Sequence, residues 1–170
     1  MWITQYDVLR PKFASIEILA LDFDGTLTDG FVHVRQDGME TVRCSRRDSL
    51  GTNLLQAAGV KVVIISKETN PVVQTRAQKM KVDCYHGVAT GEGKLEILRR
   101  YAAERQVPLE RVSYMGDDIN DLECIKAVGL GITVADGHPM CIGGADFVTT
   151  RKGGEHAVRE VCDLILEAKR

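Results

Sequence analysis

Residues 60–65 read Val-Lys-Val-Val-Ile-Ile, and this segment limits most strongly how the chain can fold. Apart from Lys61, every position in it is a β-branched apolar residue, which is typical of a strand. A strand with apolar side chains on both faces must be covered on both faces, as in a parallel sheet. Similar apolar runs, which we predict to be the other strands, occupy residues 16–23, 112–115, 130–134 and 147–148.

Segments with helical start and stop signals lie between these strands. Asn70 and Pro71 are a capping residue and a proline suited to the first helical turn. Gly129 stands where a C-terminal capping glycine would end another helix. The predicted helices are residues 71–80, 94–106, 120–128 and 155–169. The alternation of strands and helices predicts a single α/β domain over residues 1–170, with a doubly wound, mostly parallel sheet.

Residues 31–42 break this alternation of strands and helices. Their apolar and polar residues alternate around Asp37 and Gly38, a dipeptide typical of a hairpin turn. We therefore expect a β-hairpin flap that projects from the sheet with its edges exposed. Exposed strand edges usually need to be covered, and a partner subunit is one way to cover them.

The composition excludes several classes of function. The 22 basic and 24 acidic residues give a net charge of −2, and 5% of residues are aromatic, so we expect no nucleic-acid partner. No apolar run approaches the ~20 residues that span a bilayer, and the start of the chain lacks the basic-then-apolar order of a signal peptide. The five scattered cysteines fit neither a zinc site nor a disulfide framework. We therefore expect free thiols, no membrane partner and a cytoplasmic location.

Reactive side chains follow several predicted strands, at the sheet edge where ligands bind in open α/β folds. Asp22 and Asp24 come at the end of the first strand, and their spacing points both carboxylates to one side. Ser66 and Asp117 follow two further strands, and Lys94 begins a helix. Taken alone, each feature has a simpler explanation: turn chemistry for the first aspartates, helix capping for the later ones, and solvation for the lysine.

Together these side chains predict a more specific chemistry. Several carboxylates at one edge repel one another, and without a cation one or more would take up a proton. Mg²⁺ removes that repulsion, usually with one or two carboxylates and a substrate phosphate. A lysine and a hydroxyl opposite the metal would hold the remaining phosphoryl oxygens, and an aspartate can attack phosphorus. The set therefore predicts phosphoryl transfer with Mg²⁺ as cofactor.

The order of these residues resembles the four motifs of the haloacid dehalogenase superfamily of phosphatases. The motifs are Asp22-Phe-Asp24-Gly-Thr, Ser66, Lys94 and Gly116-Asp117-Asp118-x-x-Asp121. The resemblance covers residues 16–165 and implies a Rossmann-like core that performs phosphotransfer rather than dehalogenation. It implies that Asp22 attacks phosphorus, forming an aspartyl-phosphate, and that Asp24 acts as general acid and base.

The same resemblance assigns roles to the other motif residues. Mg²⁺ is implied to bind Asp22, Asp117 and the backbone carbonyl of Asp24. Ser66 and Lys94 are implied to bind the phosphoryl oxygens. The remaining acidic residues of the last motif are expected to orient metal-bound water or the lysine; they are Asp118 and Asp121.

A narrower resemblance is carried by the flap, which stands in place of a cap domain, and by three short motifs. These are Thr28-Asp29-Gly30, Arg47-Asp48 before a Gly51 turn, and Gly153-Gly154-x-x-Ala157-Val-Arg159-Glu160. They are similar to the 3-deoxy-D-manno-octulosonate 8-phosphate phosphatase branch, which also includes nonulosonate 9-phosphate phosphatases. The resemblance implies a phosphomonoesterase for a 2-keto-3-deoxy sugar-acid phosphate. It also implies a homotetramer, with the flaps in a central barrel and each tail, residues 151–170, near a neighbour's site.

Two positions depart from the octulosonate pattern. Glu68 stands where octulosonate enzymes tend to carry Arg, and Glu68, Arg76 and Lys79 match the nonulosonate pattern instead. With Arg47, these are the predicted substrate-binding residues. An arginine-rich rim suits a carboxylate, whereas Glu68 would accept sugar hydroxyls or an amine, so we expect a nonulosonate 9-phosphate to be preferred. His156 stands where glycine is common, which leaves the shape of the tail open.

Two other functions fit parts of the pattern. One is a non-catalytic tetramerisation domain associated with an acylneuraminate cytidylyltransferase, which would have lost the nucleophile, whereas Asp22 and Asp24 are both present. The other is a phosphoacceptor receiver domain, which also gathers aspartates and a lysine at strand ends. A receiver lacks the Asp-x-Asp pair followed by a flap.

Overall fold

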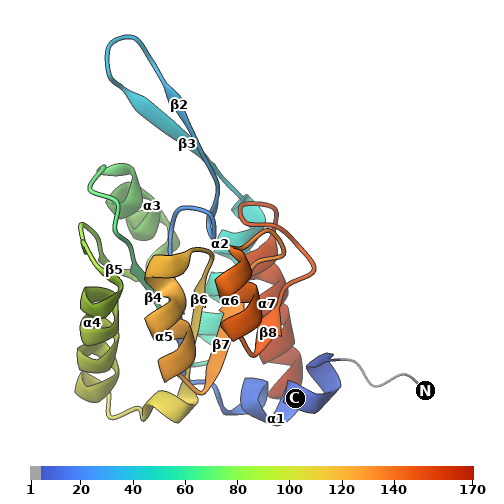
Figure 1. The fold of residues 1–170 in the computed structure, drawn as a ribbon. Coiled ribbons are helices and arrows are strands. Elements are labelled where there is room, and N and C mark those ends of the chain that lie inside the picture. The colour runs from blue at the N-terminus through green and yellow to red at the C-terminus, as the bar shows by residue number, and fades with distance from the viewer. Residues whose placement is uncertain (1–4) are drawn as a thin grey trace.

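The computed structural model describes residues 5–170. Residues 1–4 of the expected domain, which are also the first residues considered for a signal peptide, lie outside the described residues. Within residues 5–170 the main sheet has six strands, all parallel, in the order β5-β4-β1-β6-β7-β8 (Figure 1). These strands are β1 (Ile18–Leu21), β4 (Lys61–Ile65), β5 (Asp83–Tyr85), β6 (Val112–Gly116), β7 (Leu130–Thr133) and β8 (Phe147–Val148). The strand order reverses beside β1, which confirms a doubly wound α/β fold.

Helices cover both faces of the sheet. They are α1 (Gln5–Ser15), α2 (Arg46–Ala57), α3 (Val72–Met80), α4 (Gly91–Glu104), α5 (Leu122–Ala127), α6 (Pro139–Gly144) and α7 (Ala157–Ala168), with 3₁₀ turns η1 (Leu109–Arg111) and η2 (Ile119–Asp121). One apolar core packs α1, α2, α3 and α7 against the sheet, and a second packs α4, α5 and α6 against the other face. In β1, Leu19 and Leu21 belong to the first core and Ile18 and Ala20 to the second, which explains why parallel strands here are apolar throughout. No helix in the described part of the chain has the length and apolar character needed to cross a membrane.

The expected β-hairpin is present and projects from the body of the molecule (Figure 1). It pairs β2 (Thr28–Val34) with β3 (Glu40–Cys44) in antiparallel fashion, so it extends beyond residues 31–42 at both ends. Gly38 has a φ of +82° in the turn, a left-handed conformation that favours glycine. The Asp37 carboxylate accepts a hydrogen bond from the Met39 N–H, which fixes the turn.

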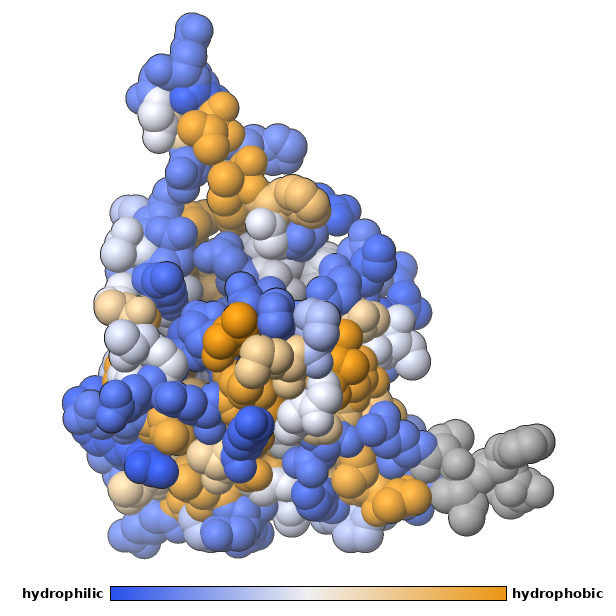
Figure 2. Space-filling view, in the orientation of Figure 1, coloured by the Kyte–Doolittle hydropathy of each residue, from blue (hydrophilic) through white to orange (hydrophobic). Residues whose placement is uncertain are grey.

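The flap carries apolar side chains into solvent. Phe31 is 74% exposed and Val34 is 65% exposed. Figure 2 shows apolar residues along the shaft of the flap, between a hydrophilic tip and the body. Within residues 5–170 nothing covers this apolar surface, so it is a candidate for an interface with another subunit.

The structure also corrects the sequence predictions. The patterns did not predict α1, α2 or α6. Gly51, expected in a turn, lies inside α2, where a Cβ would lie only 3.2 Å from the Cβ of Cys162 in α7. Gly129 follows the C-cap of α5, but its φ is not positive; glycine is needed there because a Cβ would collide with the backbone carbonyl of Glu110.

The contact between α2 and α7 encloses a carboxylate. Asp48 is fully buried, and its Oδ1 accepts a hydrogen bond of 2.9 Å from the Arg159 N–H. Its Oδ2 has no hydrogen-bond partner among the described residues. Burial raises the pKa of Asp48 to about 6, although the Arg159 N–H and the charge of Arg76 act in the opposite direction.

We predict that Asp48 makes the folded protein less stable as the pH rises from about 4 to about 6. The folded state binds this proton more tightly than the unfolded chain, whose aspartate pKa is about 3.9, so losing it costs roughly 2–3 kcal/mol. Asp48→Asn keeps an acceptor for the Arg159 N–H and carries no charge. Relative to the parent, its free energy of unfolding should therefore rise by roughly 1–2 kcal/mol between pH 4.5 and pH 7.5.

Urea denaturation of parent and variant at both pH values measures this difference. Asp163→Asn is the matched control, because Asp163 also bonds Arg159 but its side chain is 53% exposed. We expect no pH-dependent gain in the control. The same gain from Asp48→Asn at both pH values would contradict the assignment.

Candidate active site

The ends of β1 and β6 meet where the strand order reverses, and a cleft of about 900 Å³ opens there. Because β1 ends at Leu21 rather than at residue 23, Asp22 and Asp24 lie in the loop beyond the strand. Ser66 follows β4, and Asp117 follows β6. All four side chains line the cleft, so the structure brings together residues that are up to 95 positions apart (22 to 117).

Lys94 joins this group from α4. That helix begins at Gly91, after the N-cap residue Thr90, three residues before the predicted start. The Lys94 side chain is fully buried, and Nζ donates hydrogen bonds to Asp22 Oδ1 at 2.8 Å and to Asp121 Oδ1 at 2.7 Å. Burial alone would lower the pKa of Lys94, but the two carboxylates raise it above its usual value. Lys94 is therefore a buried cation in contact with the expected nucleophile.

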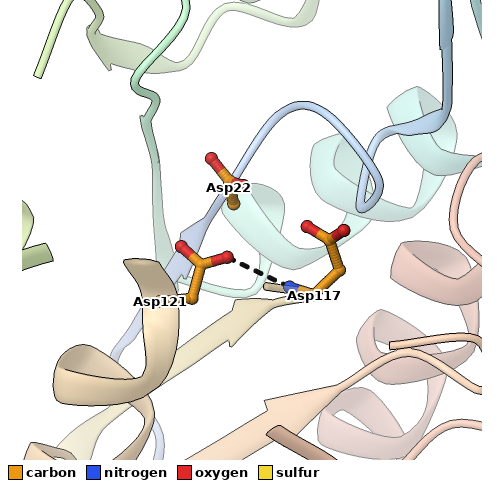
Figure 3. Close-up of side chains that lie close together, drawn as sticks. All are labelled: Asp22, Asp117 and Asp121. Carbon is orange, nitrogen blue, oxygen red and sulfur yellow. Dashed lines mark hydrogen bonds between the residues drawn. The ribbon is translucent and has the colours of Figure 1, made fainter. Parts of the chain in front are cut away.

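Asp121 is fully buried and accepts four hydrogen bonds. Its Oδ1 accepts from Lys94 and, at 2.7 Å, from the Tyr114 hydroxyl. Its Oδ2 accepts from the N–H groups of Asp117 at 3.1 Å, as Figure 3 shows, and of Asp118 at 3.3 Å. A carboxylate has about four acceptor positions, so these bonds use them all. This geometry fits the expected role of Asp121 in orienting Lys94, and it leaves no lone pair for a cation.

The acidic residues of the cleft fit a divalent cation. Asp22, Asp117 and Asp121 each place an oxygen within 4.8 Å of the other two (Figure 3). Because the four hydrogen bonds of Asp121 already use its acceptor positions, Asp22 and Asp117 are the two carboxylates of this cluster that could hold the cation. Burial, reinforced by Asp121 and opposed by Lys94, raises the pKa of Asp22 well above its usual value. Burial, together with Asp121 and Asp118, raises the pKa of Asp117 to about 7. A cation would favour ionisation of both carboxylates, and an all-oxygen donor set suits Mg²⁺.

The carboxylate of Asp24 lies outside that acidic cluster, so only its backbone carbonyl stays as the predicted metal ligand. Its Oδ1 accepts a long hydrogen bond of 3.4 Å from Thr28 Oγ1. That hydroxyl accepts from the N–H groups of Gly25 and Gly30, both at 3.1 Å, so its proton is available to Asp24. Burial and the nearby Glu68 carboxylate raise the pKa of Asp24, which favours the protonated form that a general acid needs.

Ser66 and Glu68 also line the cleft. Ser66 is buried, and its Oγ accepts a hydrogen bond from the Glu68 N–H at 3.1 Å, so its own O–H can be donated. Glu68 Oε1 accepts from the N–H groups of Thr69 at 2.7 Å and Asn70 at 2.8 Å, which holds this carboxylate at the cleft.

The other predicted substrate-binding residues do not line the cleft of the single chain. Arg76 extends from α3 and donates through Nη2 to Ser45 O at 2.7 Å and to Ser49 Oγ at 2.5 Å. Arg47 is exposed beside the start of α7, and Lys79 is exposed on α3. A role for these three in substrate binding stays a prediction.

Sequence reasoning missed how closely the C-terminal segment supports the loop after β1. A Cβ on Gly153 would collide with the backbone carbonyl of Gly25, and the Gly154 N–H donates to Thr26 O at 3.1 Å. The adjacent glycines 153 and 154 were a signal for such a close approach. His156 has a φ of +77°, which explains why glycine suits that position. By contrast, no sequence pattern indicated that Thr28 bonds Asp24 or that Tyr114 bonds Asp121.

Comparison with protein families agrees with this geometry. A family described as haloacid dehalogenase-like hydrolase matches residues 65–161. The chain is 36% identical to the 3-deoxy-D-manno-octulosonate 8-phosphate phosphatase of Yersinia pestis, over 96% of this chain and 86% of the relative.

Solved structures give the same result. A hydrolase of this superfamily, subfamily III A, from Legionella pneumophila is 35% identical with a TM-score of 0.92, covering 97% of this chain and 90% of that one. The 3-deoxy-D-manno-octulosonate 8-phosphate phosphatase of Moraxella catarrhalis is 32% identical with a TM-score of 0.90, covering 96% of this chain and 92% of that one. That structure holds a magnesium ion, a phosphate ion and the sugar acid. Our chain therefore belongs to the haloacid dehalogenase-like hydrolases, in the branch that contains the 3-deoxy-D-manno-octulosonate 8-phosphate phosphatases, and is a phosphatase.

Proposed function

We propose that this phosphatase is a Mg²⁺-dependent phosphomonoesterase for a 2-keto-3-deoxy sugar-acid phosphate and works through an aspartyl-phosphate. The observation that carries the proposal is the buried Lys94, which bonds Asp22 at the edge of a cleft that also contains Asp24 and Ser66. A purely structural domain would have no use for a buried cation beside two reactive carboxylates. The assembly-only alternative is therefore not favoured.

In the proposed reaction, a carboxylate oxygen of Asp22 attacks phosphorus while the bond from phosphorus to the sugar oxygen breaks. Asp24 begins protonated and gives its proton to the departing sugar oxygen. Water then attacks the phosphorus of the aspartyl-phosphate while the bond from phosphorus to the Asp22 oxygen breaks, and Asp24 takes up a proton from that water. Inorganic phosphate leaves, Asp22 is again a carboxylate and Asp24 is again protonated.

The remaining residues offset the negative charge of the phosphoryl group. Lys94 and the Ser66 hydroxyl would donate hydrogen bonds to its oxygens. Asp22, Asp117 and the backbone carbonyl of Asp24 would hold Mg²⁺, which when bound supplies positive charge to the phosphoryl oxygens and favours the ionised nucleophile. The raised pKa values of Asp22 and Asp117 support this assignment, because both carboxylates need a compensating cation.

Two sugar acids are candidates for the substrate. The relatives support 3-deoxy-D-manno-octulosonate 8-phosphate, because their names state this activity. Glu68 supports a nonulosonate 9-phosphate, because its carboxylate lines the cleft near Asp24 and would accept hydrogen bonds from the hydroxyls or an amine of such a sugar.

A homotetramer is part of the proposal. The cleft is wide open in the single chain, and Arg47, Arg76 and Lys79 lie outside it. Pairing of the flap edges and of the apolar side chains of Phe31 and Val34 between subunits would remove that surface from water. It would also bring rim residues of neighbouring subunits near the cleft.

The first prediction from this proposal concerns the nucleophile. Asp22→Asn keeps an oxygen that can accept the Lys94 bond but cannot attack phosphorus, so turnover should fall by about a thousandfold or more. Chelation should abolish phosphate release by the parent and added Mg²⁺ should restore it, whereas Mg²⁺ should restore nothing in the variant. Asp163→Asn, outside the cleft, is the control and should behave as the parent. Near-normal turnover by Asp22→Asn would end the aspartyl-phosphate assignment.

The second prediction concerns substrate choice, measured as kcat/KM for the octulosonate 8-phosphate and a nonulosonate 9-phosphate. We expect the parent to favour the nonulosonate and Glu68→Arg to shift the ratio toward the octulosonate by about tenfold, equal to 1.4 kcal/mol. Thr69→Arg places the same guanidinium one residue away but leaves the Glu68 carboxylate in place, and it should shift the ratio much less. A parent that favours the octulosonate tenfold, with no change in Glu68→Arg, would reject the nonulosonate.

The third prediction concerns assembly. Light scattering at micromolar concentration should give about four times the chain mass of 18.8 kDa. Val34→Lys places a charge on the flap surface and should shift the protein toward smaller species. Val8→Lys on α1 is matched, since Val8 is 69% exposed and Val34 is 65% exposed, and should leave the mass unchanged. A monomeric parent with full activity would contradict the tetramer.

A further inference from the structure

Tyr114 is a buried polar residue that the proposed reaction does not use. It lies in β6, within the apolar core that α4 and α5 cover, and its side chain has no exposed surface. A phenylalanine would fill such a place without the cost of burying a hydroxyl. Its hydroxyl donates a hydrogen bond of 2.7 Å to Asp121 Oδ1. The value of the hydroxyl must therefore lie in what it does to Asp121.

Asp121 Oδ1 is shared by the Tyr114 hydroxyl and the Lys94 ammonium, both at 2.7 Å. The other oxygen of Asp121 is occupied by two backbone N–H groups of the loop after β6. These contacts fix the carboxylate plane from two sides. Within residues 5–170 the hydroxyl is the only hydrogen-bond donor to Oδ1 besides the lysine.

We propose that Tyr114 is a positioning residue for the phosphatase reaction, holding Asp121 so that Lys94 Nζ stays against Asp22. This inference rests on the proposed role of Lys94 as a ligand of the phosphoryl oxygens. Tyr114 does not line the cleft, and its hydroxyl bonds Asp121 rather than an expected metal ligand, so its effect on the reaction passes through Asp121 and Lys94. Loss of the hydroxyl leaves Oδ1 with one donor, so Lys94 can shift toward Asp121 and away from the phosphoryl position.

The chain contains a matched tyrosine for the test. Tyr101 in α4 is 1% exposed, and its hydroxyl donates to Asp83 Oδ2, also at 2.7 Å. Asp83 bonds Arg105 at the edge of the sheet and lies outside the cleft. Tyr114→Phe and Tyr101→Phe therefore each remove one hydroxyl-to-aspartate bond from a buried ring. Only the first aspartate also holds the lysine.

The experiment compares the parent with Tyr114→Phe, Tyr101→Phe and Lys94→Met. It measures kcat and KM for p-nitrophenyl phosphate, the inhibition constant of inorganic phosphate, and the melting temperature. We expect Tyr114→Phe to weaken phosphate binding and lower kcat/KM by about tenfold, with Tyr101→Phe within twofold of the parent. Tyr114→Phe should lose more melting temperature than Tyr101→Phe, because Asp121 is fully buried whereas the Asp83 side chain is 56% exposed and can bond water instead.

The outcomes separate this inference from the proposed function. Equal phosphate affinity and kcat/KM in the two tyrosine variants would overturn the role of Tyr114, provided that Lys94→Met still loses phosphate binding. Unchanged phosphate binding in Lys94→Met would instead overturn the proposed role of the lysine. Tyr114→Met, which fills the ring volume with a flexible apolar chain, replaces Tyr114→Phe if that variant does not fold, and the same tenfold loss is expected of it.

Discussion

A buried lysine between two buried aspartates is the interaction on which the rest of the site depends. Lys94, Asp22 and Asp121 are each 5% exposed or less. Removing such charges from water costs several kcal/mol per ion, and their mutual attraction offsets that cost only while all partners are in place. Loss of one partner would leave an uncompensated buried charge, at a cost of about 3–5 kcal/mol. An apolar triad would be easier to bury, so chemistry rather than stability accounts for these charges.

The balance of charge explains why the site suits a metal ion. Asp22, Asp117 and Asp121 carry three negative charges when ionised, and Lys94 carries one positive charge, which leaves two negative charges in surplus. Burial raises the pKa of Asp22 and of Asp117, which favours their protonated, uncharged forms and so reduces the negative charge. A divalent cation has the charge that restores the balance, and the doubly charged substrate phosphate then meets a site that is no longer negative.

The loop after β1 is connected to two other parts of the molecule, the flap and the C-terminal segment. Thr28 bonds Asp24 and the N–H groups of Gly25 and Gly30, and it is also the first residue of the flap strand β2. The C-terminal segment packs against the carbonyl of Gly25. Because this loop, the flap and the tail meet within a few ångströms, the subunit assembly proposed above would act directly on the loop that carries Asp22 and Asp24.

The sequence by itself determined the parallel sheet and the chemistry at its edge. Continuous apolar strands must be covered on both faces, and the order of strands and helices leaves few topologies, so Asp22, Asp24, Ser66 and Asp117 were placed together from pattern alone. Only the tertiary structure decided which carboxylates touch Lys94. The Tyr114 bond to Asp121, the threonine behind Asp24 and the tail against the loop depend on side-chain geometry between distant segments, which no local period encodes. Helix α2 was not predicted for the same reason. Glycine has a low helix propensity, so Gly51 suggested a turn, and only the close approach of α7 explains why a glycine lies inside this helix.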